Sequence, residues 1–74
     1  MCRNIKKLRY PDRQPSETEL STAALQFIRK VSGYQKPSRR NQPAFDRAVA
    51  EVASATHQLF DELALLNRIP ENYP

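Results

Sequence analysis

Apolar side chains recur every three or four residues through the second half of the chain, and this repeat constrains the fold more than any other feature. Its members are Phe45, Val49, Val52, Thr56, Leu59 and Leu63, flanked by Ala48, Phe60 and Leu66. Five uninterrupted turns with this spacing predict one long amphipathic helix. A start capped at Asn41 puts Pro43 in the first turn, whereas a start at Ser38 would make Pro43 clash with a carbonyl. We therefore expect a helix over residues 42–67, ended by Pro70, and a tail over residues 68–74.

A shorter helix is predicted earlier in the chain. Ser16 and Glu19 have the spacing of a capping box, in which each side chain satisfies an exposed amide of the other residue. A narrow apolar stripe follows, whose members fall within about 60° of one another at roughly 100° per residue: Leu20, Ala24, Phe27 and Val31. Gly33 can close the C-terminus in the left-handed conformation. The helix is expected over about Glu17 to Ser32, within a capped unit of residues 16–33.

The two helices are joined by a short basic linker, residues 34–41, so we predict an all-α fold, an antiparallel two-helix hairpin. The N-terminal segment, residues 1–15, has no clean period and is expected to pack on the hairpin. Apolar side chains also lie off the main stripes: Leu25, Ile28, Ala50, Ala53 and Ala64. Either the N-terminal segment covers them, through Ile5, Leu8 and Tyr10, or a second chain does and the protein dimerises into a four-helix assembly.

The size of the chain fits one small helical domain over residues 1–74, with a mass of 8.5 kDa. A domain of this size buries only about 60% of the surface that its unfolded chain exposes, which makes help from a partner subunit plausible. No apolar run is long enough for a membrane span, and no signal peptide is evident. With a single cysteine and no export signal, the expected location is the cytoplasm.

Charge is distributed unevenly along the sequence. Residues 1–40 carry ten basic and three acidic residues, whereas residues 41–74 carry two basic and five acidic ones. Clustered Lys and Arg bind phosphate backbones, and nearby Tyr10 and Tyr34 could stack on bases. We therefore expect a non-catalytic binding module that contacts nucleic acid or an acidic protein. The candidate contact residues are Arg3, Lys6, Lys7, Arg9, Arg29, Lys30, Lys36, Arg39 and Arg40.

The alternative function is a metal or redox site built on Cys2. If Met1 is trimmed, Cys2 offers an amine and a thiol on one residue, which could chelate a transition metal or act as a nucleophile. His57 is the only histidine, and Asp61 lies one helical turn away, at a spacing that can orient an imidazole. The alternatives without a function are that Cys2 is an inert terminal cysteine and that His57 is a solvated histidine. Zinc would need more ligands than these residues supply.

Signatures of catalysis are otherwise absent from the sequence. Its one glycine excludes a glycine-rich phosphate loop, and neither a GxSxG nor an HExxH motif is present. The carboxylate pairs Glu17 with Glu19 and Asp61 with Glu62 have spacings that do not face each other on a helix. The pattern favours a protein that is not an enzyme.

A set of short motifs resembles a known family. The motifs are Met1-Cys2-Arg3-Asn4-Ile5-Lys6, Ala23-Ala24-Leu25-Gln26-Phe27 with Arg29-Lys30, Ser32-Gly33, Lys36-Pro37-Ser38, Asn41, Ala44-Phe45 and Ala48-Val49. Together they resemble the bacterial domain-of-unknown-function family 2277, over residues 1 to about 66. The resemblance implies a bacterial, cytosolic, helical protein of this length and no assigned activity. Pro43 departs from the family, where that position is more often acidic, and residues 67–74 have no counterpart in the resemblance.

Overall fold

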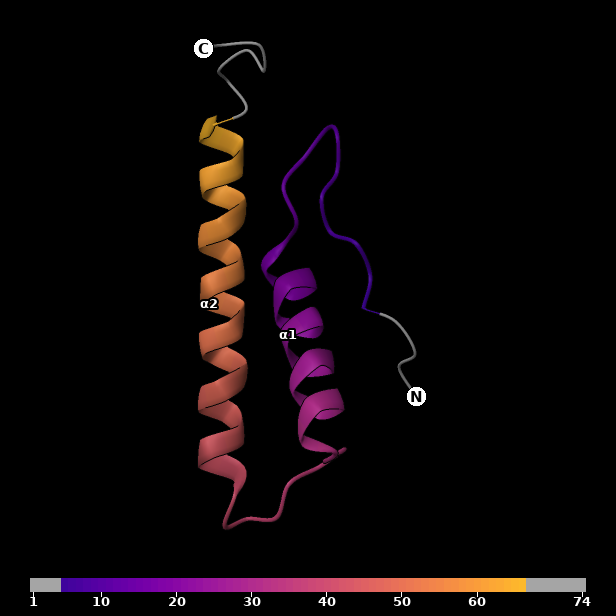
Figure 1. The fold of residues 1–74 in the computed structure, drawn as a ribbon, viewed down its shortest axis with the longest axis vertical. Coiled ribbons are helices and arrows are strands. Elements are labelled where there is room, and N and C mark those ends of the chain that lie inside the picture. The colour runs from indigo at the N-terminus through magenta and orange to yellow at the C-terminus, as the bar shows by residue number, and fades with distance from the viewer. Residues whose placement is uncertain (1–4, 67–74) are drawn as a thin grey trace.

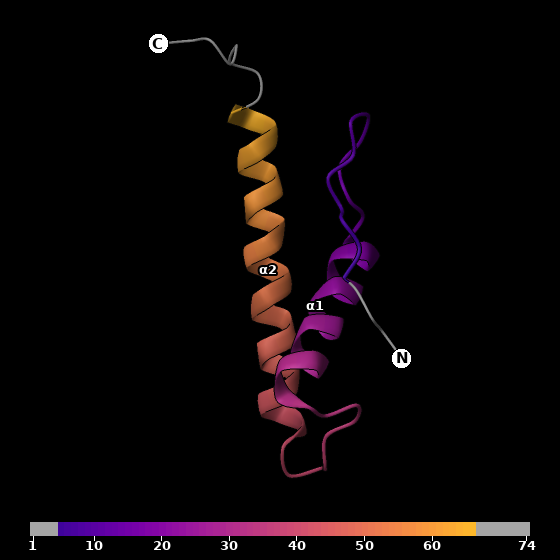
Figure 2. The same cartoon turned by 45° about the vertical axis from the view of Figure 1, so that its right-hand side comes forward.

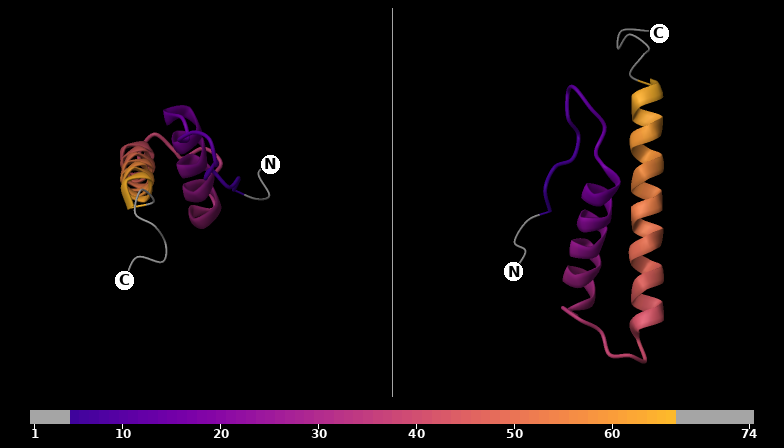
Figure 3. Two further views of the ribbon diagram at one scale, coloured as in Figure 1. Left: turned by 90° about the horizontal axis from the view of Figure 1, so that it is seen from above. Right: turned by 180° about the vertical axis from the view of Figure 1, so that it is seen from behind.

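The computed structural model describes residues 5–66, which form a hairpin of two helices (Figure 1). Helix α1 spans Glu17–Ser32 and helix α2 spans Gln42–Leu66. The two helices run side by side in opposite directions, and the linker joins them at one end (Figure 3). No strand occurs within residues 5–66. The prediction of an all-α antiparallel hairpin is confirmed.

Both ends of α1 are fixed by the local signals that predicted them. The Ser16 Oγ accepts a hydrogen bond from the Glu19 backbone N–H at 3.1 Å, and the Glu19 carboxylate accepts one from the Ser16 N–H at 2.8 Å. At the other end, Gly33 has φ +80° and donates its N–H to the Arg29 carbonyl at 2.9 Å. Only a residue without a Cβ adopts this φ without strain.

The start of α2 also agrees with the prediction. The Phe45 N–H donates to the Asn41 carbonyl at 3.0 Å, which makes Asn41 the residue that caps the helix. Pro43 therefore lies in the first turn, where no intrahelical partner is lost. The helix is described as far as Leu66. The predicted last residue, Asn67, and the tail over residues 68–74 lie outside the described residues.

The packed line of α1 differs from the predicted stripe. The buried residues are Leu20, Ala24 and Ile28, whereas Phe27 and Val31 are 43% and 62% exposed. The helices cross at an angle (Figure 2). The residues of α1 that touch α2 therefore follow an i, i+4 row, which is inclined to the helix axis, whereas the predicted stripe runs parallel to the axis. The prediction was wrong in placing Phe27 and Val31 on the packed face and Ile28 off it.

The stripe of α2 is covered unevenly along its length. Phe45 is buried, Val49, Val52, Thr56 and Leu63 are half-buried, and Leu59 and Leu66 are exposed. At 1.5 Å per residue α2 is about 38 Å long and α1 about 24 Å. The last turns of α2 therefore continue past the start of α1 (Figure 1), which is why the predicted stripe does not end in a buried core.

The N-terminal segment packs on the hairpin without regular secondary structure. The described part of this segment begins beside α1, and the chain runs past the start of that helix before it doubles back (Figure 1). Of the three predicted covering residues, Leu8 is buried and Tyr10 half-buried, whereas Ile5 is 41% exposed. Among the off-stripe residues Leu25 and Ala53 are half-buried, whereas Ala50 and Ala64 stay exposed.

Neither α1 nor α2 combines the length and the hydropathy that a helix needs to cross a membrane.

Candidate functional site

The hairpin has two ends of different charge. The open end, residues 5–20 and 54–66, carries four basic and five acidic residues. The linker end, residues 29–47, carries six basic residues and one acidic residue. In three dimensions the excess positive charge therefore concentrates at the linker, rather than over the whole N-terminal half as the sequence alone indicated.

At the open end, Glu19 collects the neighbouring donors. Its carboxylate accepts two hydrogen bonds from the Arg13 guanidinium, at 3.0 and 3.2 Å, and one from the Tyr10 hydroxyl at 2.7 Å. The Lys6 Nζ lies 3.9 Å from the same carboxylate. The Arg13 guanidinium also lies over the Tyr10 ring, 4.0 Å from its centroid. These contacts hold the N-terminal segment to α1.

The same contacts determine the electrostatics of Glu19. The Arg13 hydrogen bonds, then the Ser16 N–H and the Tyr10 hydroxyl, hold the pKa of the Glu19 carboxyl well below its usual range. The Glu19 carboxylate in turn raises the pKa of Arg13. The sequence pattern indicated Glu19 only as a capping residue and did not indicate its contacts with Arg13 and Tyr10. The available signal was that a carboxylate in a capping box accepts one backbone N–H and keeps further lone pairs for nearby cations.

At the linker end the basic side chains have no such partner within the described part of the chain. We define the linker-end patch as Arg29, Lys30, Lys36, Arg39, Arg40 and Arg47. Every member is exposed, and none forms an ion pair with another described residue. The one acidic residue nearby, Asp46, accepts a hydrogen bond from the Gln42 amide at 2.7 Å. Within residues 34–41 only Pro37 is buried, so the linker presents its other side chains to solvent.

The predicted contact residues are thus divided between the two ends. The last turn of α1 carries Arg29 and Lys30, the linker carries Lys36, Arg39 and Arg40, and the second turn of α2 carries Arg47, so all six belong to the linker end. Residues Lys6, Lys7 and Arg9 lie toward the open end, where the Lys6 Nζ is 3.9 Å from the carboxylate of Glu19 in the first turn of α1. Arg47 was not among the predicted contact residues, because its neighbours in the sequence belong to the acidic second half. Arg3 lies outside the described residues.

The two tyrosines named as stacking candidates have different environments. Tyr10 is held by Glu19 and by the Arg13 guanidinium over its ring. Tyr34 directly follows Gly33 and is 46% exposed, and within residues 5–66 its hydroxyl has no hydrogen-bond partner. Its backbone N–H donates to the Ser32 Oγ at 3.2 Å. Tyr34 is therefore the tyrosine whose ring is available to a ligand, and it lies within the linker end.

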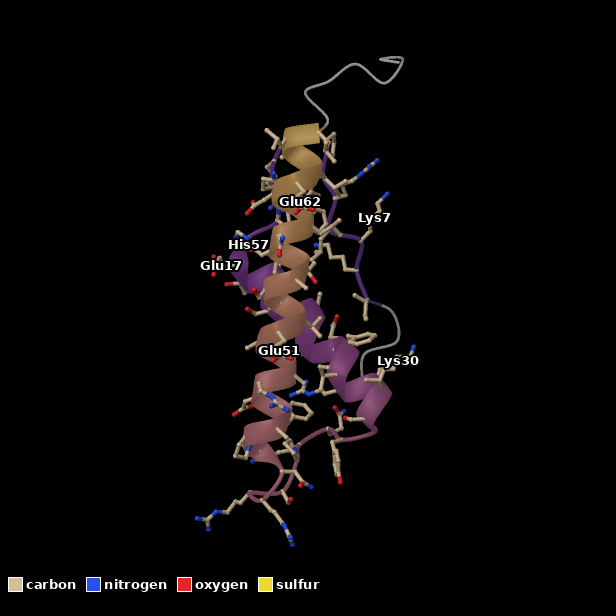
Figure 4. The ribbon with its side chains drawn as sticks, turned by 60° about the vertical axis from the view of Figure 1, so that its left-hand side comes forward. Lys7, Glu17, Lys30, Glu51, His57 and Glu62 are labelled. Carbon is tan, nitrogen blue, oxygen red and sulfur yellow. The ribbon has the colours of Figure 1, made fainter. Side chains whose placement is uncertain are left out.

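His57 contacts the predicted carboxylate and a second one. Its Nδ1 lies 3.1 Å from the Asp61 Oδ2, and its Nε2 lies 3.8 Å from the Glu17 Oε2 of α1. The three side chains border an open groove of ≈ 410 Å³ between the helices. Figure 4 shows His57 and Glu17 on the same side of the hairpin. Glu17 was missed because only the hairpin register brings it to His57. Cys2 lies outside the described residues, and residues 5–66 hold no group of three or more His, Cys, Asp or Glu side chains suited to a metal ion.

Comparison with known proteins gives one match. A protein-family model described as an uncharacterised conserved protein, DUF2277, matches residues 1–72. The match extends past residue 66, where the sequence resemblance ended. Neither the search of curated proteins nor that of solved structures found a match.

Proposed function

The chain belongs to this family of uncharacterised conserved proteins, and we propose that it is a non-catalytic binding module whose linker-end patch holds the phosphates of a nucleic acid. The observation that carries the proposal is the concentration of six exposed basic side chains, without ion-pair partners among the described residues, at one end of the hairpin. Clusters of this kind gain affinity by releasing the counterions condensed on a phosphate backbone.

The helix that leaves the linker adds to the same potential. The N-terminus of α2 carries the positive end of its dipole, and its first turn contains no acidic residue that would offset it. Arg39 and Arg40 immediately precede that end. An anion at the linker end therefore meets positive side chains and a positive helix terminus together.

One feature favours a nucleic acid over an acidic protein. Four of the six cations are arginines, but their planar guanidinium matches the oxygens of a phosphate and of a carboxylate alike, so the cations do not separate the two partners. The exposed Tyr34 lies in the same linker as Lys36, Arg39 and Arg40, and an aromatic ring among cations provides a stacking platform for a base. Single strands expose base faces that a duplex does not, so the module should prefer single-stranded nucleic acid.

The test is a titration of a labelled oligonucleotide, single-stranded and duplex, at ~50 mM and ~200 mM salt. Binding should be detectable at the lower salt concentration, should weaken at the higher one, and should be tighter for the single strand. The double variant Arg39→Glu with Arg40→Glu should weaken binding and reduce the slope of log affinity against log salt by about two.

A matched control comes from the open end. The double variant Lys7→Glu with Arg9→Glu changes the net charge by the same amount, but it should leave most of the affinity and the slope in place. Equal losses in the two variants, or no binding at the lower salt concentration, would contradict the proposal. Binding to polyglutamate but not to the oligonucleotide would replace the nucleic acid by an acidic protein.

A further inference from the structure

An aromatic ring of α1 lies exposed next to the linker end of the hairpin. Phe27 is 43% exposed, whereas its neighbour Ile28 is 9% exposed and belongs to the core. The N-terminal segment runs along the same side of the hairpin, as Lys7 and Lys30 show in Figure 4. The hydrogen bonds and the ion pair that join residues 5–15 to α1 all end on Glu19, in the first turn. The ring of Phe27, two turns farther along α1, is therefore open to a ligand.

The charges around this ring suit an anionic ligand. Residues 20–41 contain no acidic residue. Lys30 follows Phe27 by three residues, so it neighbours the ring on the surface of α1, one turn nearer the linker. Figure 4 shows Lys30 on the side of the hairpin opposite Glu17 and His57, the acidic groove. A polyanion that leaves the linker along this side of α1 meets a cation and then an aromatic ring.

We propose that Phe27 is a second base-stacking residue, and that a single strand held at the linker-end patch continues along α1 with one base on Tyr34 and another on Phe27. This inference rests on the proposed function. Cations that follow the backbone, with exposed rings between them, are the arrangement that binds single strands. An apolar protein surface fits less well, because covering Phe27 would also desolvate Lys30 without giving it a partner.

The spacing of the two rings determines which strands can use both. Gly33, which directly precedes Tyr34, lies about 9 Å along the helix axis from Phe27. Neighbouring base pairs of a duplex are only about 3.4 Å apart along each strand. A strand that places adjacent bases on both rings must therefore be extended, with those bases unstacked from each other. A duplex cannot do this, so the second ring increases the preference for single strands.

The first test uses tryptophan as a reporter, because the chain contains none. Tyr34→Trp and Phe27→Trp each introduce one indole, and Leu65→Trp introduces one at a 62% exposed position of the open end as the matched control. Single-stranded oligothymidylate, added at ~50 mM salt, should quench the emission of the first two variants, because a base stacked on an indole quenches its fluorescence. The emission of Leu65→Trp should change little.

The second test removes the aromatic ring but keeps an apolar side chain. Phe27→Leu should weaken the affinity for oligothymidylate about tenfold. The slope of log affinity against log salt should stay the same, since no charge is removed. Binding to a duplex should also stay the same, which separates lost stacking from a damaged fold. Val31→Ala is the control, because Val31 is 62% exposed in the last turn of α1 but has no ring.

The outcomes separate this inference from the proposed function. Quenching in Tyr34→Trp but not in Phe27→Trp, or an unchanged affinity in Phe27→Leu, would overturn the inference and leave the linker-end patch as the binding site. Equal quenching in Leu65→Trp would also overturn it. An indole in Phe27→Trp that acrylamide cannot reach before the oligonucleotide is added would show that protein covers this position, with the same consequence. No binding of any variant or of the unmodified chain would overturn both proposals.

Discussion

The linker end and the open end of the hairpin use charged residues in opposite ways. At the open end the Glu19 carboxylate binds Arg13, Tyr10 and the Ser16 N–H. The positive charge of Arg13 is thereby paired within the chain, and the pair holds the N-terminal segment in place. At the linker end Arg39, Arg40 and their neighbours have no ion-pair partner among residues 5–66. The number of basic residues in a stretch of sequence therefore does not predict how well that stretch binds an anion from outside the chain. What matters is which cations the fold has already paired.

The ends also differ in packing, and this difference gives the largest predicted effect. Phe45 is 9% exposed and packs near the linker, whereas Leu63 is half-buried where α2 continues past α1. Phe45→Ala should destabilise the fold by about 3 kcal/mol, which is most of the stability of a chain this small, and Leu63→Ala by about 1 kcal/mol. Thermal denaturation followed by circular dichroism measures both, and equal losses would contradict the uneven packing.

Gly33, at the linker end, gives the next effect. Its φ of +80° strains any residue with a Cβ, although a Cβ built there meets nothing within 4 Å. Gly33→Ala should therefore cost about 1–2 kcal/mol through backbone strain alone. Gly33→Asn should cost less, because asparagine tolerates the left-handed region. Chemical denaturation of the two variants separates strain from steric clash, since a clash would penalise the larger asparagine more.

At the open end the predicted effect depends on pH. The folded-state pKa of Glu19 is lowered, so its contribution to stability is present above the ordinary glutamate pKa of about 4.3 and is lost as the pH falls through the folded value. Glu19→Gln should lower the melting temperature at neutral pH, and the difference from the unmodified chain should shrink on acidification. The effect should be smaller than that of Gly33→Ala because the partners of Glu19 are largely exposed.

The control for Glu19 is Glu17, which is also in the first turn of α1. Its side chain is 89% exposed and its only ion-pair partner in the described part of the chain is His57, at 3.8 Å. Glu17→Gln should leave the pH dependence of the melting temperature nearly unchanged. A pH dependence equally reduced in both variants would mean that Glu19 acts through general charge and not through its particular contacts.

The smallest predicted effect is that of His57. Its contacts with Asp61 and Glu17 are between exposed side chains, and such pairs contribute little in water. His57→Gln should change the stability by less than about 0.5 kcal/mol. Denaturant unfolding measures this, and a loss well above that value would show that the imidazole holds the two helices together.

The sequence was informative wherever structure depends on neighbouring residues. The capping box at Ser16, the left-handed Gly33 and the start of α2 at Asn41 were all predicted because each is decided within one helical turn. The His57–Asp61 contact was predicted for the same reason. These features position the linker, and with it most of the candidate site.

Features that depend on how distant segments meet were not predictable. The burial of Ile28 in place of Val31 follows from the crossing angle of the helices, which no local pattern encodes. The pairing of Arg13 with Glu19 follows from a reversal of the chain before α1. The position of Arg47 in the linker-end patch follows from the hairpin itself, because its sequence neighbours belong to the acidic half.

The most direct test of the difference between the two ends is a nuclear magnetic resonance titration of the isotope-labelled chain with a short single-stranded oligonucleotide. The account predicts that amide shifts change over residues 34–41 and at Arg29 and Arg47, while those of residues 6–13 change little. Equal changes at Lys7 and Arg9, or changes confined to the open end, would contradict the claim that the unpaired cations of the linker hold the ligand.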